Sequence, residues 1–269
     1  MWWWSAPRCL GQFIRSTAMI NEPQPTQGQS PRAHRYGARQ LLLAGSLLLV
    51  IIPFLALLLL VEDNWGPLAS SDHTARDRLH GYALTHPAFV TVMRTASDAG
   101  SALAWQIVIA LVAIWLLSRR QWRLAAFAVV TTAGSSLLNT AVKLAVHRTR
   151  PVVSQPFVHE PGASFPSGHS QAAVVGFGVL LLVFLPLLGR RWRLVAVAAA
   201  ILGVVLIGFS RVALAAHYVS DVVAGFVLGA AWLAAMTAAF NAWNVMSGGA
   251  PLDPSKGLAR EPDEAPTGE

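Results

Sequence analysis

The chain has 269 residues, of which 54 % are hydrophobic and only 12 % charged, and this excludes an ordinary soluble globule, since such domains carry roughly 25 % charged residues. A single cysteine, Cys9, excludes an internal disulfide framework and a metal cluster held by thiolates. The net charge of +7 does not require a nucleic-acid partner, because basic loops that orient a membrane protein account for it equally well.

The N-terminal segment, residues 1–38, contains several Pro and Gln residues but no apolar stretch typical of a secretory signal. We expect a flexible cytoplasmic segment without a cleavable signal peptide, with either Met1 or Met19 as the start.

Six apolar stretches without charged residues follow, and about 20 such residues in a helix cross a bilayer of roughly 30 Å. Their Leu, Ala and Val residues do not alternate strictly with polar ones, which favours helices over barrel strands. One or two such stretches occur as buried helices of soluble proteins, but six in one chain do not fit that alternative. The sequence therefore predicts an all-α fold, an integral membrane bundle of six transmembrane helices over residues 39–246, and a disordered cytoplasmic tail over residues 247–269. The stretches are residues 41–61, 102–117, 124–142, 170–189, 194–210 and 222–245.

Arginine clusters in the short connections predict the orientation, because cytoplasmic loops favour Arg and Lys. With six membrane spans and both termini inside, all three clusters fall on the cytoplasmic side. They are Arg32, Arg35 and Arg39; Arg119, Arg120 and Arg123; and Arg190, Arg191 and Arg193. Residues 62–100 then lie outside, and their apolar pattern predicts an amphipathic helix along the membrane surface.

A second group of charged residues lies on the predicted outer side, where basic residues are disfavoured and therefore call for a reason. Lys143 stands near the outer end of an apolar helix, and Arg150 lies two turns further along the same face if the helix continues to Pro151. A Lys and an Arg that face one cavity make an anion site. Arg148 we interpret instead as an interfacial side chain that reaches toward water.

Pro166-Ser167-Gly168-His169 precedes the fourth apolar stretch. Ser167 fits an N-cap, with Gly168 and His169 as the first helical residues, and a helix N-terminus suits a phosphate group. An ordinary helix cap explains these residues equally well.

His217 and Asp221 are four residues apart, which places them on one helical face. An Asp that accepts from one imidazole nitrogen leaves the other nitrogen free to attack or to bind. The alternative is that Asp221 only caps the following helix.

Together these segments resemble the type 2 phosphatidic acid phosphatase superfamily, which shares its core with vanadium haloperoxidases. Three family motifs match in order and without departure, and they cover residues 143–221. They are Lys, six residues, Arg-Pro (KLAVHRTRP, 143–151); Pro-Ser-Gly-His (166–169); and Ser-Arg, five residues, His, three residues, Asp (SRVALAAHYVSD, 210–221). The number of spans and their sidedness extend the resemblance to about residues 40–245.

The resemblance implies a role for each motif residue. His217 is the implied nucleophile, which forms a phosphohistidine, Asp221 orients it, and His169 is the general acid and then the base. Cations and a helix N-terminus stabilise the transferred phosphoryl group, so the expected chemistry needs no metal and no cofactor. The residues expected to hold the phosphate oxygens are Lys143, Arg150, Ser167, Gly168 and Arg211. His147, His159 and Glu160 match no motif position, and we expect at most substrate-entry contacts from them.

The expected partner is a lipid phosphate in the bilayer, with no nucleic acid. The connection 152–165 is short and leaves no room for a large head-group domain. Among family substrates we favour an isoprenoid diphosphate such as undecaprenyl diphosphate over phosphatidic acid, phosphatidylglycerol phosphate and diacylglycerol pyrophosphate. The expected location is a bacterial inner membrane, with the active site on the extracytoplasmic face. Two competing functions are a lipid transporter that binds without hydrolysis and a vanadate-dependent peroxidase.

Overall fold

The computed structural model describes residues 51–246. The predictions for residues 1–38, for the tail 247–269, for the first arginine cluster and for the first ten residues of the stretch 41–61 lie outside the described residues.

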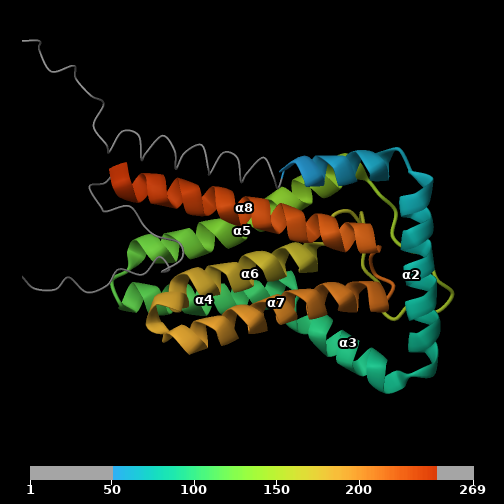
Figure 1. Ribbon diagram of the computed structural model, residues 1–269, viewed down its shortest axis with the longest axis horizontal. Coiled ribbons are helices and arrows are strands. Elements are labelled where there is room, and N and C mark those ends of the chain that lie inside the picture. Colours follow the sequence, from blue (N-terminus) through green and yellow to red (C-terminus); the bar gives the residue numbers. More distant parts are fainter. Residues whose placement is uncertain (1–50, 247–269) are drawn as a thin grey trace, which may run out of the picture. The chain divides into compact units, whose positions relative to one another are not determined.

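The described part of the chain is built from helices, and no strand occurs between residues 51 and 246. This confirms the predicted all-α fold. In chain order the elements are the helix Ile51–Glu62, α2 (Gly66–Thr85), α3 (Pro87–Ala99), α4 (Ala102–Ser118), α5 (Trp122–Val146), α6 (Gly168–Phe184), the short 3-10 turn η1 (Leu185–Leu187), α7 (Arg190–Ala213) and α8 (Val219–Met246) (Figure 1).

Four elements, α5, α6 together with η1, α7 and α8, are long and apolar enough to cross a membrane. The number rises to six if each of two bent helix pairs counts as one span. The helix Ile51–Glu62 meets α2 at 87°, and α3 meets α4 at 46°. These helices correspond to the apolar stretches of the sequence, although α4 has only 17 residues and reaches full span length only with α3.

The segment expected to lie along the membrane surface forms two helices instead of one. Figure 1 shows α2 lying across one end of the bundle, where it packs against α7 and α8, and α3 returning along α7. Asp72 and His80 of α2 and Ser97 of α3 are buried. The expectation of a helix that only covers the surface was therefore incomplete, because both helices also reach inward.

Helix α6 lies at the centre of the bundle and packs against α4, α5, α7 and α8. Close packing with α8 depends on a glycine, because a Cβ on Gly225 would lie 2.6 Å from the backbone oxygen of Ser167. The absent side chain lets the first turns of α6 and α8 approach each other directly. This approach brings the second and third sequence motifs together.

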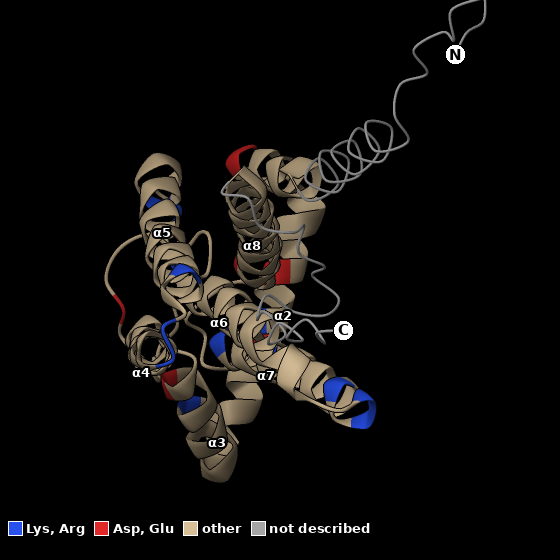
Figure 2. Ribbon diagram, turned by 90° about the vertical axis from the view of Figure 1, so that its left-hand side faces the viewer, with Lys and Arg blue, Asp and Glu red and all other residues tan. Residues whose placement is uncertain are grey.

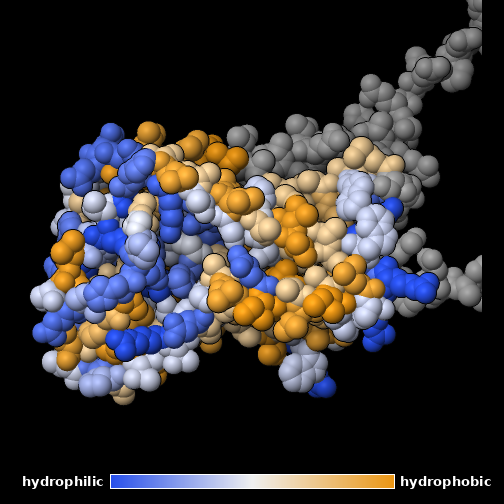
Figure 3. Space-filling view, turned by 180° about the vertical axis from the view of Figure 1, so that it is seen from behind, coloured by the Kyte–Doolittle hydropathy of each residue, from blue (hydrophilic) through white to orange (hydrophobic). Residues whose placement is uncertain are grey.

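The two ends of the bundle differ in charge. The α4–α5 connection and the beginning of α7, which carry the two described arginine clusters, lie at the same end (Figure 2). The beginnings of α6 and α8 lie at the other end, beneath α2 (Figure 1). An apolar belt separates the hydrophilic ends (Figure 3). Large apolar side chains are exposed in the middle of α4, α5 and α7, among them Leu111, Leu137 and Leu202. An apolar surface of this extent is typical of helices that face lipid.

Candidate functional site

The beginning of α6 has the predicted cap. Ser167 is the N-cap, its hydroxyl accepts from the amide of Ser170 at 3.5 Å, and α6 starts at Gly168. The amide of Ser167 donates to the carbonyl of Asp221 at 2.9 Å, which fixes this cap against α8. Lys143 reaches the same place, since its Nζ lies 3.9 Å from where a Cβ of Gly168 would be. The free amides of this helix start and a lysine therefore share one location.

His217 lies in the connection between α7 and α8, and both it and Asp221 are buried. The prediction that the two residues share one helical face was wrong, because α8 begins only at Val219. Its Nδ1 lies 3.4 Å from Asp221 Oδ2, and the same oxygen accepts from the amide of Tyr218 at 3.0 Å. Asp221 thus accepts from the amide that precedes α8 and also faces the imidazole, so the two interpretations of this residue hold together. Burial lowers the pKa of His217 to about 4, although Asp221 acts in the opposite direction. At neutral pH the imidazole is uncharged.

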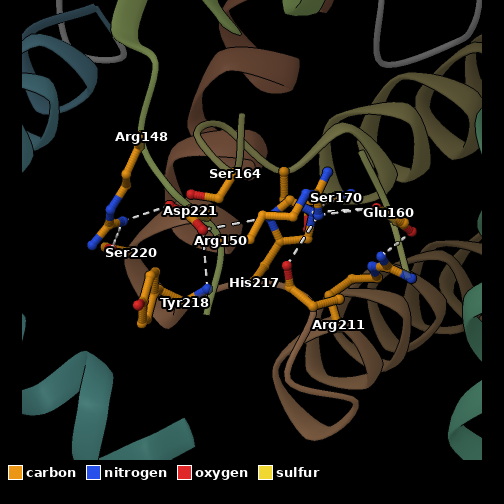
Figure 4. Close-up of polar contacts among 12 residues, drawn as sticks. Arg148, Arg150, Glu160, Ser164, Ser170, Arg211, His217, Tyr218, Ser220 and Asp221 are labelled. Carbon is orange, nitrogen blue, oxygen red and sulfur yellow. Dashed lines mark hydrogen bonds and ion pairs between the residues drawn. The ribbon is translucent and has the colours of Figure 1, made fainter. Parts of the chain in front are cut away.

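Two arginines and a carboxylate stand at the other nitrogen of His217 (Figure 4). Arg150 Nη1 lies 3.2 Å from His217 Nε2 and 3.0 Å from Glu160 Oε2. Arg211 Nη2 contacts Glu160 Oε1, and Glu160 Oε2 lies 4.0 Å from His217 Nε2. Burial raises the pKa of Glu160, but Arg211, His169 and Arg150 outweigh it and hold the pKa below its ordinary value. An ionised carboxylate therefore occupies the space in front of the imidazole.

Arg150 reaches the site by a different route from the one expected. Helix α5 ends at Val146, with His147 in the left-handed conformation at φ 52°, so the helix does not continue to Pro151. The prediction that Lys143 and Arg150 share one helical face was wrong. Arg150 lies in the connection after α5, where Nε donates to the carbonyl of Gly162 at 3.2 Å and Nη1 to that of Ala216 at 3.0 Å.

Arg148 does not reach toward water, and its interpretation as an interfacial side chain was wrong. Its guanidinium bridges two buried carboxylates, with Nη1 2.5 Å from Asp221 Oδ1 and Nη2 2.9 Å from Asp72 Oδ2. It also donates to Ser220 Oγ at 2.7 Å and lies over the ring of Tyr218, 4.5 Å from its centroid. The attraction of two carboxylates in a low-dielectric environment outweighs the solvation that the side chain gives up.

The remaining motif residue, His169, lies in the first turn of α6 and interacts electrostatically with Arg211, Glu160 and His217. All eight residues selected from the sequence thus lie at one end of the bundle. His147 and His159 are exposed. Within residues 51–246 no group of three or more His, Cys, Asp or Glu side chains is placed to hold a metal ion.

Three residues of the site were not predicted from the sequence: Asp72 on α2, Ser97 on α3, and Ser220. Glu160 was expected to make at most a substrate-entry contact, whereas it pairs with Arg150 and Arg211. The side chain of Ser97 accepts from Arg211 Nη1, and Asp72 accepts from both the amide and the hydroxyl of Ser220. Nothing in the sequence singles out Asp72 or Ser97, because residues 62–100 contain many polar residues. Glu160 carried a usable signal, since it and Asp221 are the only acidic residues between positions 99 and 252.

Comparison with known proteins gives a consistent result. The family model of the PAP2 superfamily matches residues 123–244. Phosphatidylglycerophosphatase B of Bacillus subtilis is 43 % identical over 96 residues, which are 35 % of this chain and 46 % of that protein. A lipid A 1-phosphatase of Rhizobium johnstonii is 36 % identical over 122 residues, 42 % of this chain and 46 % of that protein. The chain thus spans about half the length of the curated relatives it matches.

A solved structure has a similar fold over most of its length. The crystal structure of a transmembrane PAP2 type phosphatidylglycerolphosphate phosphatase from Bacillus subtilis superposes with a TM-score of 0.64 at 26 % identity. The match covers 71 % of this chain and 94 % of that one. The similarity therefore extends beyond the residues that the family model matches.

Proposed function

Residues 123–244 belong to the PAP2 superfamily, and from this premise we propose that the chain is an integral-membrane lipid phosphatase. It hydrolyses a phosphate monoester or diphosphate group of a lipid through a phosphohistidine intermediate and without a metal ion. The placement of the motif residues around the uncharged imidazole of His217 supports this reaction.

The proposed reaction has two steps at one nitrogen. His217 Nε2 attacks the phosphorus while the bond to the lipid oxygen breaks, and His169 gives that oxygen a proton. His169 then takes a proton from water, whose oxygen attacks the phosphohistidine and releases phosphate. Asp221 holds Nδ1 so that the free electron pair is on Nε2.

Charge stabilisation is the main task in such a transfer, because the equatorial phosphoryl oxygens carry the negative charge. The groups proposed to bind these oxygens are Lys143, Arg150, Arg211, the Ser167 side chain and the amides at Gly168. Three cations together with a helix N-terminus supply the positive potential that a metal ion supplies in other phosphatases.

The observation that carries the proposal is the position of Glu160. Its carboxylate lies between Arg150 and Arg211, in front of His217 Nε2. A carboxylate is a small oxyanion, and its position between Arg150 and Arg211, 4.0 Å from His217 Nε2, supports the proposal that these side chains accept an oxyanion beside the imidazole. A phosphate group that displaces Glu160 has its phosphorus next to the nucleophile.

The apolar belt supports a lipid as the substrate, since a head group can enter the site while the acyl or prenyl chain stays against the helices. We propose undecaprenyl diphosphate, or a lipid of the phosphatidic acid or phosphatidylglycerol phosphate type. The names of the relatives add lipid A to the candidates. The arginine clusters at the opposite end support a proposed location of the site on the extracytoplasmic face of a bacterial inner membrane, with both termini proposed to be cytoplasmic.

Phosphate release from a panel of these lipids by the detergent-purified protein, with a metal chelator present, tests the proposal. We expect release with at least one lipid, loss of that activity in His217→Ala, and an acid-labile phosphohistidine after brief exposure to labelled substrate. The control is His86→Ala, which removes an exposed histidine between α2 and α3, outside residues 143–221, and leaves the rate unchanged. Absence of release with every lipid, or full activity in His217→Ala, overturns the proposal.

A further inference from the structure

Asp72 is the buried carboxylate that no motif contains, and it lies outside the residues that the family model matches. Only 1 % of its surface is exposed. All of its partners belong to the site region: the amide of Ser220 at 3.0 Å, the hydroxyl of the same residue, and Arg148 Nη2 at 2.9 Å. A buried carboxylate is costly unless it is fully paired, and here the pairing is made with the start of α8 and with Arg148.

The amide of Ser220 belongs to the first turn of α8, where backbone N–H groups have no partner within the helix. Asp72 satisfies one of them from another helix, and Asp221 satisfies the amide of Tyr218 from within α8. The first turn of α8 is therefore held by two carboxylates, of which one also faces His217.

Arg148 links these two carboxylates. Its Nη1 donates to Asp221 Oδ1, which leaves Oδ2 for Tyr218 and for His217 Nδ1. The chain of contacts thus runs from Asp72 through Arg148 and Asp221 to His217 (Figure 4 shows the last three). Arg148 lies between the carboxylates of Asp72 and Asp221. Each carboxylate therefore offsets part of the positive charge that Arg148 exerts on the other carboxylate.

We infer that Asp72 is a positioning residue for the phosphoryl transfer, which acts through Arg148 and Ser220 to keep Asp221 oriented toward His217 and to limit how far Arg148 offsets the negative charge of Asp221. This inference rests on the proposed function. Without the charge of Asp72, the full charge of Arg148 acts on Asp221, and the attraction of Asp221 for a protonated His217 weakens. Helix α2 is then part of the catalytic apparatus and does not only cover the site.

The charge balance gives two variants with opposite effects. In Asp72→Asn the imidazolium form of His217 is less stable, so the acidic limb of the kcat/KM profile moves to lower pH. In Arg148→Gln a cation beside Asp221 is removed, and the acidic limb moves to higher pH. We expect shifts on the order of half a pH unit, from the interaction of charges about 10 Å apart at intermediate dielectric. The loss of orientation in Asp72→Asn also lowers kcat about tenfold.

Besides Asp72 and Arg148, other titratable and charged groups face His217, and neither variant replaces them. They are Asp221 from α8, Arg211 from α7, His169 from α6, and Arg150 and Glu160 from the connection between α5 and α6. The matched control is Asp77→Asn, which removes an exposed carboxylate of the same helix that pairs with Arg76 at 2.7 Å. The control leaves both kcat and the acidic limb unchanged.

The experiment measures pH profiles of phosphate release for the wild type, both variants and the control, together with the thermal midpoint of each protein. A purely structural role of Asp72 lowers the midpoint but leaves the acidic limb in place, and that result overturns the inference. Shifts in the same direction for both variants overturn it as well. If Asp72→Asn does not fold, the direction of the Arg148→Gln shift decides.

A second measurement separates this inference from the proposed function. The titration of the His217 ring, followed by NMR of histidine-labelled protein and assigned with His217→Asn, needs no turnover. A wild type that releases no phosphate contradicts the proposed function, while the ring titrations still show the opposite shifts if the contacts act as inferred. An active wild type with the same ring titration in all variants overturns the inference alone.

Discussion

Two parts of the described chain meet at the site, and they contribute different things to it. Helices α5–α8 and their connections hold the residues that surround the carboxylate of Glu160. Helices α2 and α3 supply acceptors to the site arginines: Asp72 accepts from Arg148, and Ser97 accepts from Nη1 of Arg211, whose Nη2 contacts Glu160. Burying a cluster of cations costs desolvation free energy unless hydrogen-bond acceptors pair with it. Acceptors such as Asp72 and Ser97 keep the arginines in place when no anion is bound. The comparison shows why residues 123–244 alone do not contain the whole site.

The largest expected difference in kcat/KM is between a variant of Arg211 on α7 and a variant of Ser97 on α3. Arg211→Lys keeps the charge but loses the planar fork, and we expect kcat/KM for a lipid phosphate to fall roughly 100-fold or more. Ser97→Ala removes an acceptor of the same guanidinium and costs about tenfold or less, because the contact of Arg211 with Glu160 remains. Steady-state kinetics on both variants check the order. Equal losses would show that α3 is as directly involved as α7.

The pH profile of kcat/KM tests whether burial keeps the imidazole of His217 uncharged. Because burial lowers the pKa of His217 to about 4, the nucleophile stays uncharged through the ordinary histidine range. The sign follows from the role: a nucleophile must be unprotonated, so kcat/KM holds as pH falls to about 4 and then drops about tenfold per unit. An acidic limb near the ordinary histidine value would mean that water reaches His217 in solution.

A substitution of Glu160 tests whether phosphate binds where the Glu160 carboxylate lies, between Arg150 and Arg211. In Glu160→Gln a neutral amide competes with an incoming anion less than a carboxylate does, and inorganic phosphate should inhibit about tenfold more strongly. Inhibition constants for phosphate, measured beside Glu62→Gln as an exposed control, decide this. Unchanged inhibition in Glu160→Gln would mean that phosphate binds elsewhere.

The smallest expected effect is on stability and uses one glycine from each part. Gly225→Ala forces a Cβ to 2.6 Å from a backbone oxygen, and we expect a loss of about 1–3 kcal/mol and a lower thermal midpoint. Gly81→Ala in α2 meets nothing within 4 Å and should be neutral or stabilise by up to about 1 kcal/mol. Thermal unfolding in the same detergent compares the two, and equal midpoints would contradict the close approach of α6 and α8.

Local sequence signals predicted the helices and eight residues that lie together at one end of the bundle. The cap at Ser167 lies within one helical turn, so local spacing alone determines it. The contact of His217 with Asp221 is also local, but it forms ahead of α8 because His217 precedes the first helical residue. The six apolar stretches likewise need only composition. The end of α5 was missed because Pro151 suggested a later stop than the left-handed His147 provides.

The sequence by itself therefore determined an all-helical membrane-capable chain and which residue types the proposed phosphate site contains. Only the tertiary structure decided what stands behind and in front of these residues. Arg148 contacts Asp221 and Asp72 across separations of 73 and 76 residues, and Arg211 contacts Glu160 across 51. No local pattern encodes such pairs, because they form only where packed helices bring opposite charges into a common low-dielectric space. Helix α2 belongs to the site for this reason, because its Asp72 pairs with Arg148 and Ser220.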